Sequence, residues 1–467
     1  MAAHMTDLSA LLQPDKGQPA TALHLVDKDG LDSWLKAQPQ RVRQAAAAQG
    51  FKAEGYQFAF LPGDKADQWS AALGVAKAEE PSVWCLSKAA DLLPEGTYRV
   101  AERGPGPAVL GWLLGQYRFG RYKEDKAPKG PRVLLTDEPA RIAETAMIAE
   151  ATFLVRDLVN TPAQDLGPAE LEAAAAKVAK SAGASLSSVS GARLEKEYPM
   201  VAAVGRAATA ERAPRMLEML WGDTRHPRIA IVGKGVCFDS GGLDIKSAEG
   251  MRLMKKDMGG AAHALALAGL IVKSRLPVRL QLLVPAVENA VSGAAFRPGD
   301  ILKSRKGLTV EVGNTDAEGR LVLGDALTRA AELEPELILD FATLTGAARV
   351  ALGPDLPALF ANRDELAEAL LGAGEAVSDP LWRMPLWKHY DEMLTSDVAD
   401  LGNVAEGSMA GAVTAALFLQ RFVPEGTAWA HLDTFAWRSS AKPGRPKGGD
   451  ALGLRAAWEM LKARYAA

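Results

Sequence analysis

The chain has 467 residues and a formal net charge of −3, and it is 48% hydrophobic and 24% charged. This balance excludes attraction to nucleic acid or to an anionic membrane as the main mode of binding, and no apolar run reaches the roughly 18 residues that span a bilayer. Two cysteines and a start without signal-peptide features predict a soluble, cytoplasmic protein of two or three domains.

Residues 1–135 are predicted to form a smaller α/β domain. Within it, YQFAFLP (56–62) and PRVLLTD (131–137) have the composition of strands, whereas WSAALGVAKA (69–78) is expected to be a helix. No group of polar residues in this part points to catalysis. The leading MAAHM is set aside as a remnant of an expression vector.

Residues 136–160 are predicted to connect this domain to a second one. ARIAETAMIAEATFLVRDLVN (140–160) has apolar residues at helical spacing, and NTPAQDLGP then breaks the helix with two prolines and a glycine. The second domain is expected to cover residues 161–467.

In the second domain, apolar strands alternate with helices. The strands contain near-continuous runs of β-branched residues and leucine, which is typical of strands covered by helices on both faces. The pattern predicts a doubly wound α/β fold, with ligands at the carboxyl ends of the strands. Strands are predicted at 228–235, 278–289, 308–314, 336–348 and 427–435, and helices at 258–274 and after residue 318.

Three segments carry unusual polar residues, and each is expected to follow a strand. They are VGKGVCFDSGGLDIKS (232–247), MRLMKKDMGGAA (251–262) and NTDAEGR (314–320). If these strand exits are neighbours, one crevice gathers Asp239, Asp257, Asp316 and Glu318. Four carboxylates repel one another unless cations hold them, and hard oxygen ligands suit Mg²⁺, Mn²⁺ or Zn²⁺. Once two such cations balance the four carboxylates, the positive charges of Lys246 and Arg320 favour the binding of one anion beside Arg320.

Each acidic residue also has a simpler interpretation. The acids of NTDAEGR are good helix-capping residues and suit the helix dipole. Asp239 could bond its own turn, and Asp257 could cap a helix. Taken one at a time, these alternatives stay open.

The other polar residues of interest have simpler interpretations too. Lys234 could be a solvated loop lysine or a phosphate ligand, although its position before the glycines does not match a P-loop. His263 and His431 lie in apolar segments and are expected in the core, and Cys237 is expected to pack as a small apolar side chain.

Taken together and in this order, the motifs VGKGVCFDSGGLDIK, MKKDMGGAA and NTDAEGRLVLGDAL resemble those of the cytosolic leucine aminopeptidase family. NTDAEGRL is the most specific of them. The resemblance continues through DFATLTGAARVALG, ADLGN, AGAVTAALFLQRFV and WAHLDTFAW, and it covers residues 140–460. Before residue 135, only LGWLLGQYRFGRYK is similar to the family.

The resemblance implies a set of site residues. A more exchangeable metal ion would be held by Asp239, Asp316 and Glu318, together with the main-chain carbonyl of Asp316. A more tightly bound ion would be held by Lys234, Asp239, Asp257 and Glu318. Lys246 and Arg320 match the two catalytic positions. The pocket for the first substrate side chain would be lined by Met254, Thr343 and Gly346.

The resemblance further implies hydrolysis of the N-terminal, leucine-like residue of peptides by a water that two metal ions activate. Zn²⁺ or Mn²⁺ are the expected ions, bicarbonate is expected near Arg320, and the family forms homohexamers. Three alternatives remain. The first is a DNA-binding accessory protein, whose basic clusters would be PQRVRQ and KEDKAPKGPR. The second is an inactive oligomeric relative, and the third is an ATP-dependent enzyme.

Overall fold

The computed structural model describes residues 7–123 and 130–466, so MAAHM and most of KEDKAPKGPR lie outside the described residues. The chain divides into two compact units. One contains the chain up to Phe153 together with Ser440–Lys447, and the other contains Leu154–Ser439 and Gly448–Ala467. The division falls inside helix α5 (Ile142–Asn160), which forms the long helix predicted from the apolar spacing.

The first unit contains a six-stranded sheet in the order β1-β6-β5-β2-β4-β3. Its neighbouring strands are parallel except β3 and β4, which are antiparallel. The strands predicted at 56–62 and 131–137 are present as β3 and β6. The unit's elements are β1 (Leu12–Pro14), β2 (Thr21–Val26), α1 (Leu31–Ala37), α2 (Gln40–Ala48), β3 (Phe58–Pro62), β4 (Trp69–Gly74), α3 (Ser87–Leu92), β5 (Gly96–Val100), α4 (Ala108–Leu114) and β6 (Arg132–Thr136).

The helix predicted for residues 69–78 is wrong, because Trp69–Gly74 forms strand β4. This strand pairs with β2 on one side and β3 on the other. Ala71 and Ala72 point to opposite faces of the sheet, and both are completely buried. The alanines favoured a helix by propensity alone, and the hydrogen bonds to two neighbouring strands outweigh that preference.

The second unit is built on a nine-stranded sheet in the order β16-β15-β18-β14-β9-β11-β8-β7, with β10 paired beside β11. Strands β18, β14, β9 and β11 are parallel, and antiparallel strands follow on both sides. The strands are β7 (Ser185–Ser190), β8 (Arg215–Trp221), β9 (Arg228–Gly233), β10 (Gly235–Asp239), β11 (Arg279–Asn289), β14 (Leu337–Ala342), β15 (Ala358–Ala361), β16 (Trp382–Arg383) and β18 (Ala428–Asp433).

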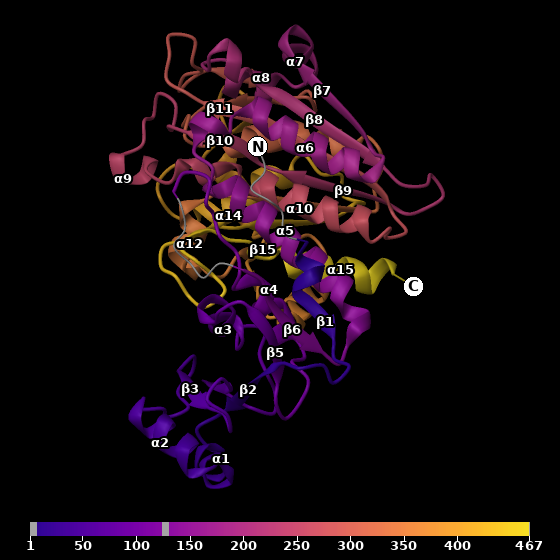
Figure 1. Ribbon diagram of the computed structural model, residues 1–467. Helices are drawn as coiled ribbons and strands as arrows, with labels where there is room; N and C mark the ends of the chain where they lie inside the picture. The colour runs from indigo at the N-terminus through magenta and orange to yellow at the C-terminus, as the bar shows by residue number, and fades with distance from the viewer. Residues whose placement is uncertain (1–6, 124–129, 467) are drawn as a thin grey trace. The chain divides into compact units, whose positions relative to one another are not determined.

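Helices cover the central strands of this sheet, as Figure 1 shows for α6 and α10. Helix α10 packs with α6 and α15, whereas α11 packs with α8 and α14, and all residues of β14 are buried. The doubly wound prediction is therefore confirmed. The helices are α6 (Pro168–Ala182), α7 (Gly191–Glu197), α8 (Pro199–Gly205), α9 (Ala248–Met251), α10 (Gly259–Lys273), α11 (Glu318–Ala331), α12 (Gly346–Leu352), α13 (Asp364–Ala376), α14 (Gly411–Gln420) and α15 (Leu454–Tyr465).

Two of the three expected strand exits differ from the prediction. The segment 251–262 contains a short 3₁₀ helix, η5 (Met254–Met258), which leads directly into α10. The segment before NTDAEGR is strand β13 (Thr309–Glu311), and it belongs to a separate small sheet with β12 (Ile301–Lys303) and β17 (Leu401–Gly402). The short pair β19 (Trp437–Arg438) and β20 (Gly448–Gly449) completes the strands.

The central parallel strands end at one edge of the sheet. Strands β9, β14 and β18 end at Gly233, Ala342 and Asp433, which brings the loops after them together. No helix in the described residues is both long enough and apolar enough to cross a membrane.

Candidate active site

Lys234 directly follows β9 and is 2% exposed. Its Nζ lies 2.7 Å from Asp257 Oδ2 and 2.9 Å from Glu318 Oε1, and it donates a hydrogen bond of 3.1 Å to the Thr343 carbonyl. The interpretation of Lys234 as a solvated loop lysine is therefore wrong. The side chain is the centre of a buried cluster of acids.

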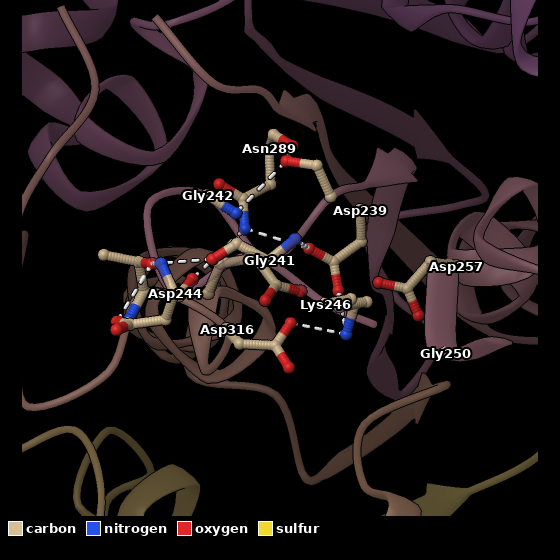
Figure 2. A network of polar contacts seen from close by, with 12 residues as sticks. Asp239, Gly241, Gly242, Asp244, Lys246, Gly250, Asp257, Asn289 and Asp316 are labelled. Carbon is tan, nitrogen blue, oxygen red and sulfur yellow. Dashed lines mark hydrogen bonds and ion pairs between the residues drawn. The ribbon is translucent and has the colours of Figure 1, made fainter. Parts of the chain in front are cut away.

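Asp239 ends β10 and is held by two hydrogen bonds to Oδ1, from the Gly241 N–H at 2.9 Å and from Asn289 Nδ2 at 2.9 Å. The first bond is the turn contact that the simpler interpretation expected. Asp239 Oδ2, however, lies 2.8 Å from Lys246 Nζ. Figure 2 shows Lys246 close to the carboxylates of Asp239 and Asp316.

Asp316 does not cap helix α11, whose N-cap is Ala317 without a side-chain cap. The preceding Thr315 fixes this turn, since its hydroxyl donates to the Gly241 carbonyl at 2.6 Å and its N–H donates to Asp244 at 2.7 Å. These bonds connect NTDAEGR to the glycine loop after β10. The helix-capping interpretation of Asp316 is wrong.

Glu318 begins α11 and is 1% exposed. The next residue has to be small, since a Cβ on Gly319 would lie 2.7 Å from Lys234 Nζ. Arg320 is also buried, and it donates a hydrogen bond of 2.7 Å to the Asn403 carbonyl. Burial lowers the pKa of Arg320 to about 10, against the opposing charge of Glu318.

Asp257 lies in η5 and caps neither that helix nor α10, because the N-cap residues are Leu253 and Met258. Its Oδ1 accepts a hydrogen bond of 2.8 Å from the Thr343 hydroxyl, and its Oδ2 faces Lys234. The capping interpretation of Asp257 is therefore also wrong.

The acids and lysines of this cluster shift each other's pKa values. Burial and the nearby Asp239 raise the pKa of Glu318 to about 8 and that of Asp316 to about 6. Burial acts to lower the pKa values of Lys234 and Lys246, but the surrounding carboxylates outweigh it and hold both above their usual range. The four carboxyl groups of Asp239, Asp257, Asp316 and Glu318 therefore have only the ammonium groups of Lys234 and Lys246 as close positive partners in the cluster, within the described part of the chain.

The cluster has the chemistry of a cation site. Asp257 Oδ2, Asp316 Oδ1 and both oxygens of Glu318 are buried and accept no hydrogen bond from the residues that the structure describes, although three of these atoms lie at ion-pair distance from a lysine. A buried carboxylate oxygen without a donor is costly. Asp239, Asp316 and Glu318 each offer an oxygen within 4.8 Å of the others. These residues therefore fit hard divalent ions.

A cavity of about 800 Å³ opens onto the cluster. Among the predicted site residues, Glu318 and Arg320 are not part of its wall. The wall includes the predicted metal and catalytic residues Lys234, Asp239, Lys246, Asp257 and Asp316 and the predicted pocket residues Met254, Thr343 and Gly346. The structure thus brings eight of the predicted residues to one cavity.

Several residues that support the site were not predicted. Asp433 ends β18 and accepts hydrogen bonds from the Leu344 N–H at 3.0 Å and the Thr345 hydroxyl at 2.7 Å, which fixes the loop after β14. Asn289 holds Asp239, and Asn403 holds Arg320. The signal in the sequence is the same for Asp433 and Asn289, because each is a polar residue that ends an apolar strand.

Lys256 was missed as well. It is 5% exposed, and it lines the cavity between Met254 and Asp257 of the same 3₁₀ helix. Burial lowers the pKa of Lys256 to about 8, against the opposing charge of Asp257. In contrast, His263 and His431 are core residues as predicted, since they are 0% and 1% exposed, and Cys237 is buried.

Comparison with known proteins identifies the family. The model of the cytosol aminopeptidase family catalytic domain matches residues 153–457, and that of the M17 aminopeptidase N-terminal domain matches residues 21–135. The chain belongs to the cytosol aminopeptidase family. The resemblance inferred from the motifs is thereby confirmed, and it extends to the N-terminal domain.

Similar proteins agree with this assignment. The chain is 38% identical to a probable cytosol aminopeptidase of Syntrophotalea carbinolica over 97% of this chain and 88% of the relative. The crystal structure of the cytosol aminopeptidase from Coxiella burnetii matches with a TM-score of 0.92 and 44% identity, covering 97% of this chain and 99% of that one. The structure of the bottromycin maturation enzyme BotP in complex with Mn matches with a TM-score of 0.84 and 32% identity, covering 97% of this chain and 99% of that one. As a cytosol aminopeptidase family member, the protein is a metal-dependent aminopeptidase.

Proposed function

We propose that the protein hydrolyses the N-terminal residue from peptides with a free N-terminus, with two divalent metal ions bound at the acidic cluster. The observation that carries this proposal is the cluster of four carboxylates and two lysines, in which Asp257 Oδ2, Asp316 Oδ1 and both oxygens of Glu318 accept no hydrogen bond from the described residues. Asp239, Asp316 and Glu318 would hold one ion, and Lys234, Asp239, Asp257 and Glu318 the other. Zn²⁺ or Mn²⁺ are the ions we favour.

The bound ions would lower the pKa of a water and polarise the scissile carbonyl. The side chains of the protein then position and stabilise the substrate. The Lys246 ammonium, in the cavity wall, suits stabilisation of the negative charge that develops on the carbonyl oxygen. The fixed charge and forked geometry of Arg320 suit bicarbonate, which would take up a proton of the attacking water.

Met254, Thr343 and Gly346 are the residues that we assign to the first substrate side chain. All three line the cavity beside Asp257. Met254 offers an apolar contact, which favours leucine-like residues. The free amino group of the substrate would be bound within the acidic cluster, and this explains why a blocked N-terminus should not be accepted.

The assembly and location that we propose follow the family resemblance. We propose a homohexamer in the cytoplasm that acts on peptides. A DNA-binding role is less well supported by a net charge of −3. An inactive relative is less well supported because every proposed ligand is present, and an ATP-dependent enzyme because the P-loop pattern is absent from the sequence.

Removal and return of metal ions tests the function. We expect leucine p-nitroanilide to be hydrolysed, the activity to fall at least about 100-fold after chelation, and Mn²⁺ or Zn²⁺ to restore it. Acetyl-leucine p-nitroanilide, whose amino group is blocked, serves as the control and should not be cleaved. Absence of activity with every ion, in protein that circular dichroism shows to be folded, would contradict the proposal.

Metal affinity is expected to rise with pH. The carboxylates around Lys234 outweigh its burial and raise its pKa, so an ion that uses this nitrogen as a ligand must displace a proton. Glu318, with a pKa of about 8, releases a second proton below that pH. Affinity should therefore rise about tenfold per pH unit above pH 8, and more steeply below it.

Isothermal titration with Mn²⁺ between pH 6.5 and 9, in buffers of different ionisation enthalpy, measures the number of protons released. A Lys234→Met variant should release one proton fewer per chain. Binding that releases no proton at any pH would contradict the assignment of Lys234 as a neutral ligand.

A further inference from the structure

The cavity wall carries a buried cation, Lys256, whose ion pair with Asp257 is long. Lys256 is 5% exposed, and its Nζ donates no hydrogen bond within residues 7–123 and 130–466. The nearest acidic oxygen, Asp257 Oδ1, is 3.9 Å away, which is beyond hydrogen-bond distance. That oxygen already accepts a hydrogen bond from the Thr343 hydroxyl. The Lys256 ammonium is therefore free to meet an anion that enters the cavity.

A second cation lies near the same place. Lys256 Nζ is 5.1 Å from the centre of the Phe435 ring, and the guanidinium carbon of Arg349 is 5.0 Å from the centre of the same ring. Arg349 is exposed on α12 and forms no ion pair in the part of the chain that the structure describes. Both side chains and the ring line the cavity. A desolvated ammonium and a guanidinium around one aromatic ring form an electropositive patch.

Within the residues that the structure describes, no acid of the cavity wall forms an ion pair shorter than 3.9 Å with Lys256 or Arg349. Asp433 is bound by the Leu344 N–H and by Thr345 through its N–H and hydroxyl. Asp257 faces Lys234 at 2.7 Å. Glu249 lies in the cavity wall on α9, but it is exposed and forms no ion pair with either cation. A carboxylate from outside the protein is the ligand that would complete the patch.

We propose that Lys256, with Arg349, binds the side-chain carboxylate of an acidic first residue, so that peptides beginning with glutamate or aspartate are substrates. The inference rests on the proposed function, since it concerns the pocket of the same site. Lys256 is two residues from Met254, one of the residues assigned to the first side chain, and both line the cavity. Leucine-like residues contact the apolar part of the pocket, and acidic residues extend further to the ammonium.

The test compares kcat/KM for glutamate, aspartate and leucine p-nitroanilides in the metal-loaded enzyme. We expect the wild-type glutamate-to-leucine ratio to lie within about tenfold of unity, and Lys256→Met to lower it at least about tenfold, chiefly through KM. Arg349→Gln should lower the ratio less, because its charge is exposed.

Lys255→Met is the matched control. Lys255 is the adjacent residue, but its Nζ donates to the Asn160 carbonyl at 2.6 Å and lies over Trp437, and it is not part of the cavity wall. This variant should leave the ratio unchanged. An unchanged ratio in Lys256→Met, or a wild-type ratio below about 10⁻³, would overturn the inference. Failure to cleave the leucine substrate as well would instead overturn the proposed function.

Discussion

Replacing Asp257 with asparagine is expected to lower kcat for leucine p-nitroanilide by at least about 10³-fold while the chain stays folded. The amide keeps the shape of the carboxylate, and its oxygen can still accept the 2.8 Å hydrogen bond of Thr343. It removes the negative charge that faces Lys234 at 2.7 Å. A neutral amide binds a divalent ion more weakly than a carboxylate, so one of the two proposed ions should be lost.

Metal content by elemental analysis should fall from two ions to one per chain, and thermal unfolding should remain cooperative. Asp340→Asn is the matched control, because Asp340 is also completely buried in this unit, where it accepts a hydrogen bond of 2.7 Å from Trp429. It should keep its metal ions. A kcat equal to that of the wild type in Asp257→Asn would refute the assignment of Asp257 as a ligand.

Lys246→Met is expected to lower kcat by about 10²- to 10³-fold and to leave the metal content unchanged. The Lys246 ammonium lies 2.8 Å from Asp239 Oδ2 and contacts Asp316, and it reaches the cavity wall. Metal ions would satisfy both carboxylates without it. The charge is then available for the substrate oxygen, and its removal should act on the transition state more than on binding.

Separate measurements of kcat, KM and bound metal distinguish this role from a structural one. Lys246→Arg keeps the positive charge and should recover part of the lost kcat. If Lys246→Met loses metal ions in proportion to kcat, Lys246 only holds the ligands in place. If kcat changes less than about tenfold, the residue has no catalytic role.

The sequence predicted the second unit better than the first. Strands such as Arg228–Gly233 and Leu337–Ala342 are buried on both faces, and their continuous apolar runs identify them without further information. Trp69–Gly74 was assigned wrongly, because its alanines have a local helix preference and its strand character comes only from pairing with β2 and β3. The helix or strand propensity of a segment predicts its structure poorly where hydrogen bonds to distant strands determine that structure.

The acids of the site could be predicted because unusual polar residues follow apolar segments. The residues that hold these acids and Arg320 in place, or that lie beside them in the cavity wall, were harder to predict. Lys256 looked like an ordinary charged residue of MKKD, and only its burial next to Phe435 distinguishes it from Lys255, whose charge is satisfied by Asn160. Asn403 is far along the chain from Arg320, and the sequence alone does not indicate which backbone carbonyl would accept from the guanidinium.

The parallel order of β9, β14 and β18 has a consequence for biosynthesis. These strands are about a hundred residues apart in the chain, and the loops after them meet only when all three are paired. Asp433, at the end of the last strand, fixes the loop that carries Thr343. A nascent chain on the ribosome therefore carries the four acids of the site before the loop with Thr343 is fixed by Asp433. We therefore expect a nascent chain to lack hydrolytic activity until β18 has been added to the sheet.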